Sequence, residues 1–207
     1  AIAAGMASDS RELFAGDARP IFIAGSTWTQ DEAVLIEVAR ELKGQIRFVF
    51  VPHEPHEEHL SDLEARLKAR GLSSCRYSSA PSWKEDVLIV DQVGILAELY
   101  LSGRFAFVGG SFRTTVHSVM EPVAAGCLTF VGPLHLNNRE ALELKSIKAW
   151  NGLTCVEEVD SAQAMIKRLR IALQTDSKSL SEKIRNEIEA RGGASDRVVE
   201  WVLSVSS

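Results

Sequence analysis

Short apolar runs alternate with amphipathic stretches along most of the chain. The apolar runs are typical of strands buried in a parallel sheet, and they lie at residues 21–25, 46–51, 87–90, 105–108, 128–131 and 153–156. Apolar residues at helical spacing follow these runs, at residues 31–42, around 60–67, and at 95–101, 116–125 and 139–144. This alternation predicts βαβ units, and hence an α/β fold in which helices flank a Rossmann-like parallel sheet.

The two ends of the chain depart from this alternation. Residues 1–18 have no strand partner and are expected to form a leading linker or interdomain segment, whereas residues 19–175 form the sheet domain. Helical spacing continues at 161–173, 179–189 and 195–205, with a break at Arg191-Gly192-Gly193. We therefore expect residues 176–207 to form C-terminal helices beyond the sheet domain.

Composition limits the class of protein. The 207 residues are 45% hydrophobic and 25% charged, with a formal net charge of −5, which is ordinary for a globular protein. The basic residues are scattered, which argues against a nucleic-acid binder and a strong membrane-surface patch but leaves a peripheral membrane contact open. Three widely spaced cysteines in no metal-binding pattern favour a reducing compartment. Because the chain begins without Met, we expect it to be a piece of a longer protein.

Candidate chemistry lies in the loops that follow the strands, because open parallel sheets bind ligands at the carboxyl ends of their strands. Gly25-Ser26-Thr27 offers a close backbone approach and two hydroxyls, which suit either a ligand or a helix cap. Asp91 to Gly94 leads into a helix whose free N–H groups suit a phosphate, with Asp91 more typical of a cap. Gly132-Pro133 predicts a sharp turn, and Asn137 or Asn138 the cap of the next helix.

The segment from Gly109 to Pro122 is the most informative. Gly109 and Gly110 follow a buried strand and remove side chains where a ligand must come close. The next helix offers its N-terminus to an anion. We place Glu121 one turn into that helix, where its carboxylate either bridges ribose hydroxyls or is simply solvated.

Other motifs argue against competing functions. The histidine-rich segment 53–59 lacks the HExxH spacing and is better explained as a solvated helix start than as a metal site. The hydrolase motif GxSxG and the dinucleotide fingerprint GxGxxG are both absent.

Six motifs in the same order resemble the C-terminal half of the 3-deoxy-D-manno-octulosonic acid (Kdo) transferases of lipopolysaccharide synthesis. They are Gly25-Ser26-Thr27, Val51-Pro52 with Pro55, Asp91 with Gly94 and Glu98-Leu99, residues 107–111, His117 with Glu121-Pro122, and Gly132-Pro133 with Asn137. The resemblance covers roughly residues 20–157 and implies one half of a GT-B glycosyltransferase, in which two Rossmann-like halves face each other across a cleft.

The resemblance also implies a division of labour. This half would bind the nucleotide sugar CMP-Kdo as donor substrate, with no cofactor and no metal. A missing N-terminal half would bind the lipid A precursor and supply the catalytic base, and the helix near Trp201 would cross back toward it. The full-length bacterial enzyme would act in the cytoplasm, at the cytoplasmic face of the inner membrane. The residues expected in donor binding are Ser26, Thr27, Gly94, Ile95, Leu96, Gly110, Ser111, Arg113, His117, Ser118, Glu121 and Asn137. Among them Arg113, a free cation near the phosphate, is our own inference and is not implied by the resemblance.

Two departures keep alternatives open. The Kdo transferases usually read Pro-Arg-His-Pro where this chain has Pro52-His53-Glu54-Pro55, so the Arg expected to meet the donor phosphate is missing. They also usually read Gly-Gly-His-Asn-Pro-Leu-Glu where residues 115–121 are Thr-Val-His-Ser-Val-Met-Glu. The alternatives are a GT-B transferase with another donor, such as a UDP-sugar, and a degenerate, non-catalytic nucleotide-binding or interaction module.

Overall fold

A seven-stranded parallel sheet forms the centre of the computed structural model, which describes residues 14, 16–80 and 82–190. The strand order is β3-β4-β2-β1-β5-β6-β9. The bounds are β1 Ile21–Thr27, β2 Arg47–Pro52, β3 Ser74–Arg76, β4 Val87–Ile89, β5 Phe105–Val108, β6 Leu128–Val131 and β9 Val156–Glu158. The first strand, β1, lies in the middle of the sheet. The strands β2, β4 and β3 follow outward on one side of it, and β5, β6 and β9 follow outward on the other. The predicted α/β fold with a parallel sheet is confirmed.

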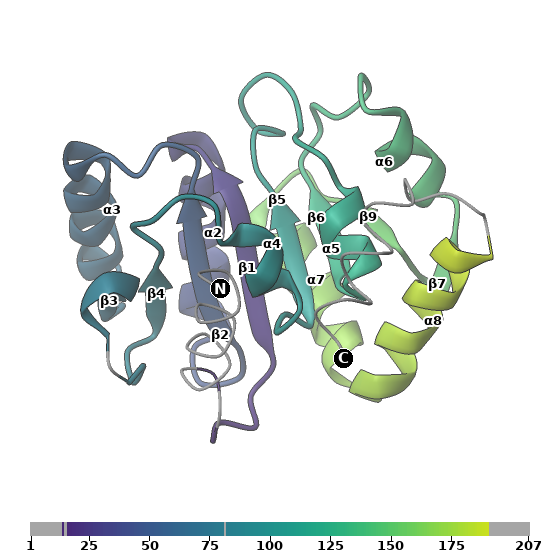
Figure 1. Cartoon of the computed structure of the whole chain (residues 1–207), viewed down its shortest axis with the longest axis horizontal. Helices are drawn as coiled ribbons and strands as arrows, with labels where there is room; N and C mark the ends of the chain where they lie inside the picture. The colour runs from purple at the N-terminus through teal and green to yellow at the C-terminus, as the bar shows by residue number, and fades with distance from the viewer. Residues whose placement is uncertain (1–13, 15, 81, 191–207) are drawn as a thin grey trace, which may run out of the picture.

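Helices cover both faces of this sheet, with α4 and α5 in front and α2 and α7 behind in the view of Figure 1. The long helices are α2 Thr29–Glu41, α3 Glu57–Ala69, α7 Ala162–Leu173 and α8 Ser177–Glu189. The short ones are α4 Leu96–Tyr100, α5 Met120–Ala124, α6 Arg139–Leu144 and the 3-10 turn η1 Tyr77–Ser79. A separate antiparallel pair consists of β7 Lys148–Trp150 and β8 Leu153–Thr154.

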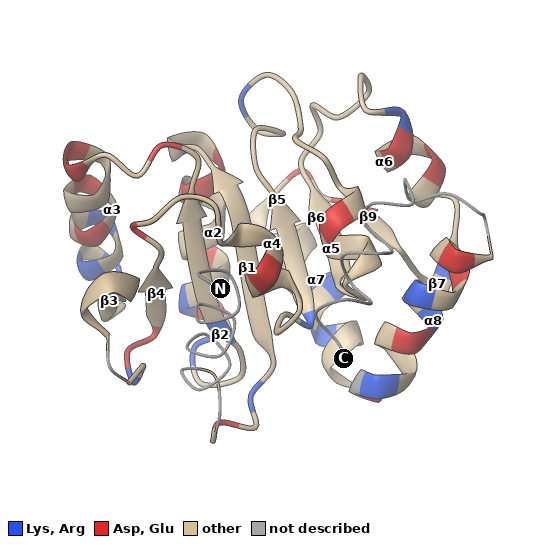
Figure 2. Ribbon diagram, viewed as in Figure 1, with Lys and Arg blue, Asp and Glu red and all other residues tan. Residues whose placement is uncertain are grey.

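Alternate residues of the strands fill two apolar layers. Six fully buried phenylalanines lie in the larger layer, together with apolar residues of α2 and α7: Phe22, Phe48, Phe50, Phe105, Phe107 and Phe130. Ile23, Val49 and Ala106 belong to the second layer, which includes residues of α4. Burial on both faces explains why the strands read as continuous apolar runs. Figure 2 accordingly shows charges along α3 and α8 and few on the central strands.

Two predicted elements differ from the observed ones. The helix predicted for 116–125 begins only at Met120, because the preceding residues turn back on the strand end, where His117 N–H donates to Gly109 O. The strand predicted for 153–156 is divided at Cys155: residues 153–154 pair with β7, and 156–158 join the main sheet. The strands β3 and β7 were not predicted, because neither has a continuous buried run: β3 is half-buried throughout, and β7 has one buried residue between two exposed ones.

Helix α8 is the last element among the described residues. Its N-cap is Asp176, whose side chain accepts from Ser179 N–H at 2.8 Å, and the helix packs against α5. The helix predicted for 195–205, the break at 191–193 and most of the segment 1–18 lie outside the described residues. The division at residues 18 and 175 therefore stays a prediction. No helix in the described part of the chain is long and apolar enough to span a membrane.

Candidate functional site

The loops after β1, β2, β5 and β6 meet at one edge of the sheet, next to the point between β1 and β5 where the strand order reverses. Such a reversal is where open α/β sheets form their ligand crevice. A Cβ on Gly109 would lie 2.0 Å from Ser26 O, so the loops after β1 and β5 touch through backbone. Gly109 N–H also donates to Gly25 O at 2.9 Å. The glycine is needed for the protein's own packing, which corrects our expectation that it makes room for a ligand.

Gly110 also serves internal packing. Its φ is +89°, and a Cβ there would lie 2.1 Å from Thr115 O. The N–H groups of residues 113, 114 and 115 all donate to Gly110 O, at 3.0, 3.0 and 3.1 Å. The loop is therefore closed upon itself by its own backbone.

The buried carboxylate of Asp31 ties this loop to the start of α2. It accepts N–H bonds from Trp28 at 3.0 Å, from Gly110 at 2.8 Å and from Phe112 at 3.1 Å. Burial raises the pKa of Asp31, and the three N–H donors act in the opposite direction. Sequence reasoning missed this residue, because an acidic residue in a first helical turn is explained by the helix alone.

Four planar side chains form what we call the stacked series: Arg113, Trp28, His53 and His117. The Arg113 guanidinium carbon lies 3.8 Å from the centre of the Trp28 ring. The Trp28 and His53 rings are 4.7 Å apart, and the His53 and His117 rings 4.6 Å apart. These residues come from the loops after β5, β1 and β2. The series was not predicted, because no local pattern links its members.

The stacked series has an unbalanced charge. Burial lowers the pKa of His117, and neighbouring His53 lowers it further, against the opposing influence of Asp31. Arg113 has no ion-pair partner among the described residues. The cationic end of the series is thus left without a counter-charge from the described part of the protein.

Two predicted donor-binding hydroxyls are used inside the protein. Thr27 Oγ1 donates to Glu32 Oε1 at 3.2 Å. Ser111 Oγ donates to Val108 O at 3.1 Å and accepts from Gly132 N–H at 2.7 Å. Both residues have no exposed surface. Both hydroxyls support the loops in this structure, and the expectation that the two residues border a ligand stays a prediction.

The predicted segment before α4 reaches the same edge from the front face. Gly94 has a φ of +88°, Ile95 is buried and Leu96 is half-buried. A Cβ on Gly25 would lie 2.9 Å from Leu96 Cδ1, so this segment packs on the end of β1, close to half-buried Ser26. Asp91 does not cap α4 as favoured above; it accepts from Ser78 N–H at 3.0 Å and holds η1.

The remaining predicted residues are spread around the start of α5. Ser118 Oγ accepts from Met120 N–H at 3.3 Å. Glu121 is half-buried and lies in the first turn of α5, not one turn into a helix, because the helix begins later than predicted. It makes no ion pair with the described residues. Asn137 donates to Thr115 Oγ1, and Asn138 caps α6 by accepting from Ala141 N–H at 2.8 Å.

The histidine-rich segment does not gather around a common point. The His53 ring lies against the Trp28 ring at an angle of 34°, His59 Nε2 lies 2.8 Å from Glu32 Oε1, and His56 is exposed. Within the described ranges no three His, Cys, Asp or Glu side chains come together as metal ligands would.

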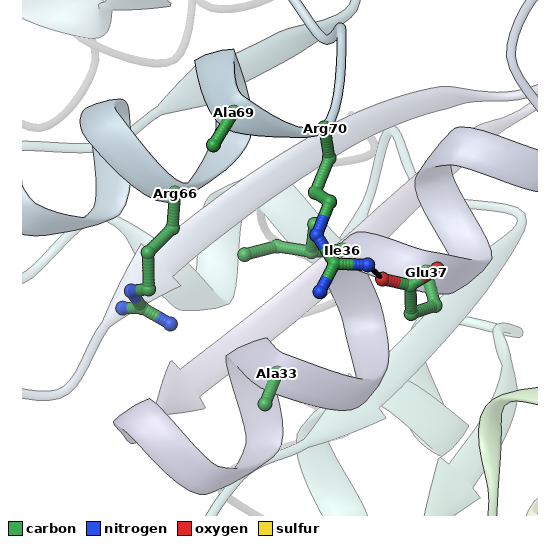
Figure 3. Close-up of a pocket in the computed structure, with 6 residues that line it drawn as sticks. All are labelled: Ala33, Ile36, Glu37, Arg66, Ala69 and Arg70. Atoms are coloured by element: carbon green, nitrogen blue, oxygen red, sulfur yellow. Dashed lines mark hydrogen bonds and ion pairs between the residues drawn. The ribbon is translucent and has the colours of Figure 1, made fainter.

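A cavity of about 180 Å³ lies elsewhere, between α2 and α3 (Figure 3). It is lined by Ala33, Ile36, Glu37, Arg66, Ala69 and Arg70, none of which we predicted for donor binding. Both of its arginines face carboxylates: Arg66 bonds to Glu32 and Asp62, and Arg70 to Glu37.

Known proteins similar to this chain agree with the motifs. No model of a protein family matches it. The 3-deoxy-D-manno-octulosonic acid transferase of Chlamydophila psittaci is 32% identical over 125 residues, 59% of this chain and 28% of that protein. A bifunctional glycosyltransferase/methyltransferase of Fusobacterium nucleatum is 32% identical over 110 residues, 51% of this chain and 17% of that protein. The matched part is thus less than a third of either relative.

A solved structure extends the likeness to the fold. The C-terminal CMP-Kdo binding domain of WaaA from Acinetobacter baumannii has a TM-score of 0.68 and 20% identity to this chain, covering 88% of the chain and 95% of that domain. The resemblance to the Kdo transferases is confirmed. The chain has the fold of the C-terminal half of a GT-B glycosyltransferase.

Proposed function

We propose that this chain is the donor-binding half of a glycosyltransferase that transfers Kdo from CMP-Kdo to a lipid A precursor. The observation that carries the proposal is the coincidence of two things at one sheet edge. The motifs shared with the Kdo transferases fall on the loops after β1, β4, β5 and β6, and these loops surround the reversal of strand order, where this fold binds ligands.

The contribution of this half is to hold and orient the donor. Backbone at Gly94 to Leu96 would contact the nucleotide, and the Glu121 carboxylate would bind the ribose hydroxyls. The acceptor hydroxyl would attack the anomeric carbon of Kdo with the help of a base from the other half, and CMP would leave. The lipid acceptor and the location at the cytoplasmic face of the inner membrane belong to the whole protein and are part of the proposal.

A second candidate is a GT-B transferase with another nucleotide sugar. The observation that favours it is His53, which takes the place of an Arg and stacks between Trp28 and His117 without supplying a permanent charge.

Calorimetric titration of the chain with CMP, CDP and UDP separates the candidates. Tighter binding of CMP supports the Kdo transferase proposal. Tighter binding of UDP moves the protein to another donor class. No binding of any of the three contradicts a nucleotide site in this chain and favours a degenerate module.

The first prediction concerns Glu121. The substitution Glu121→Ala should weaken binding of the preferred nucleotide about tenfold, because hydrogen bonds to a charged group contribute about 1.5 kcal/mol or more. The thermal midpoint should stay unchanged, since the carboxylate pairs with no described residue. Glu140→Ala, in the first turn of α6, is the control. Equal affinities for the two variants would remove Glu121 from the site.

A further inference from the structure

The loop after β5 uses most of its backbone donors inside the protein. A glycine-rich loop at this position usually offers N–H groups to a phosphate. Here Gly110 and Phe112 donate to the Asp31 carboxylate, residues 113–115 donate to Gly110 O, and His117 donates to Gly109 O. An internal carboxylate thus takes the place that an anionic ligand would fill. Side chains are therefore the main remaining means by which this loop could hold an anion.

Arg113 is the permanently charged side chain of this loop. Each of the other arginines that the structure describes bonds to a carboxylate or to a backbone carbonyl; even Arg104 and Arg185 donate to carbonyl oxygens. No such bond engages Arg113, which contacts the Trp28 ring instead. Its five N–H groups therefore have no acceptor among the residues that the structure describes.

The contact with Trp28 holds the guanidinium without consuming its donors. An arginine stacks on an aromatic ring through its flat face and keeps its edge, where the N–H groups point outward, available for a phosphate. Trp28 is fixed by its backbone bond to Asp31, and His53 covers it at 4.7 Å. Holding a long side chain in place before binding lowers the entropy lost on binding.

We propose that Arg113 binds the phosphate of the nucleotide and that Trp28, supported by His53, is the residue that positions it. The proposal rests on the proposed function, because it assumes a nucleotide at this edge. It assigns to the loop after β5 the positive charge that is missing at His53 after β2. Loss of the Trp28 ring should then weaken phosphate binding by Arg113, because Trp28 positions Arg113.

The test compares CMP with cytidine, which lacks the phosphate, in calorimetric titrations of the 207-residue chain. The ratio of the two affinities measures the phosphate contribution alone. Arg113→Gln should lower the CMP affinity about tenfold and leave the cytidine affinity unchanged. Arg139→Gln, whose side chain is 92% exposed in α6, should change neither.

Two further variants test the positioning role. Trp28→Leu removes the ring and should reduce the ratio of CMP to cytidine affinity severalfold, whereas Trp28→Phe keeps a stacking surface and should retain most of it. Thermal midpoints check whether both variants are folded. If Trp28→Leu is unfolded, the affinity ratio of Trp28→Phe still tests the role of the ring. A fall with Trp28→Phe as large as with Trp28→Leu would contradict stacking as the cause.

The outcomes separate this inference from the proposed function. If the unmodified chain prefers CMP to cytidine and Arg113→Gln does not change the ratio, the inference is wrong and the proposed function stands. If the unmodified chain binds no nucleotide, both are wrong. If it binds CMP and cytidine equally, it has no phosphate subsite and the inference is overturned.

Discussion

Two regions of the molecule contain exposed or partly exposed arginines, and they differ in whether a carboxylate pairs with the guanidinium. Between α2 and α3, Arg66 and Arg70 line a cavity of about 180 Å³ (Figure 3), but Glu32, Asp62 and Glu37 face them. At the edge of the sheet, Arg113 lies over Trp28, and no described carboxylate pairs with it. The cavity is hollow, but carboxylates neutralise the charges of its two arginines. At the sheet edge the charge of Arg113 is not neutralised by any described residue. If Arg113 binds the phosphate as we propose, the comparison teaches that unused donors mark an anion site better than volume does.

Neighbouring carboxylates at the start of α2 serve these two regions. Asp31 bonds to the loop that carries Arg113, and Glu32 bonds to Arg66 and His59 of α3. Both residues have no exposed surface. Removing Asp31 leaves neutral backbone N–H groups without an acceptor, whereas removing Glu32 takes a buried carboxylate away from the charged Arg66 guanidinium.

The largest effect is expected in the α2–α3 region. Glu32→Ala removes the buried carboxylate that Arg66 and His59 share and leaves Arg66 with only the more exposed Asp62. It should lower the free energy of unfolding by about 4 kcal/mol. Urea denaturation measures it. Glu37→Gln, which breaks the more exposed pair with Arg70, should cost less than about 1 kcal/mol. Similar losses for the two variants would mean that the Glu32 cluster is no more than a surface ion pair.

A smaller loss is expected at the sheet edge. Asp31→Ala leaves the N–H groups of Trp28, Gly110 and Phe112 without their acceptor and should cost about 3 kcal/mol. Asp31→Asn keeps one acceptor oxygen and should cost less. Urea denaturation of both variants checks the order. If Asp31→Asn is as harmful as Asp31→Ala, the charge and not the hydrogen bonds holds the loop.

The smallest effect concerns the histidines of the stacked series. Because burial lowers the pKa of His117, the unfolded chain takes up a proton at higher pH than the folded chain does. This contribution to stability is full above the unfolded pKa of about 6.5 and is lost as pH falls below it. Between about pH 7.5 and about pH 5.5, His117→Asn should therefore lose less stability than the unmodified chain. The exposed His56→Asn is the control, and an unchanged pH dependence in His117→Asn would contradict this account.

The buried strands of the fold could be predicted from the sequence, whereas the less buried strands and the pairing between strands could not. Six apolar runs predicted six of the seven strands of the main sheet, because burial on both faces leaves a continuous signal. The strand β3 carries no such signal, since its three residues are all half-buried. The run at 153–156 covered two strands that belong to different sheets, because apolar composition does not reveal a strand's partner.

The sequence predicted which loops meet at the carboxyl ends of the central strands, but not the contacts inside these loops. Gly109 was expected to admit a ligand and instead admits Ser26, because a glycine pattern shows that something comes close and not what. Thr27 and Ser111 were expected to face a ligand and are sealed inside. Trp28, Asp31 and His53 were missed, because their contacts join loops that lie far apart in the sequence.

The pairing of β1 with β5, from Phe22 opposite Phe105 to Gly25 opposite Val108, gives the site a mechanical meaning. One wing of the sheet, β3-β4-β2-β1, supplies Trp28 and His53, and the other, β5-β6-β9, supplies Arg113 and His117. A ligand held by residues of both wings would link them across the seam between them, which is the pairing of β1 with β5. The site would disappear when the seam opens, even while each wing keeps its own strands. Binding would therefore strengthen the joint between the wings more than the wings themselves.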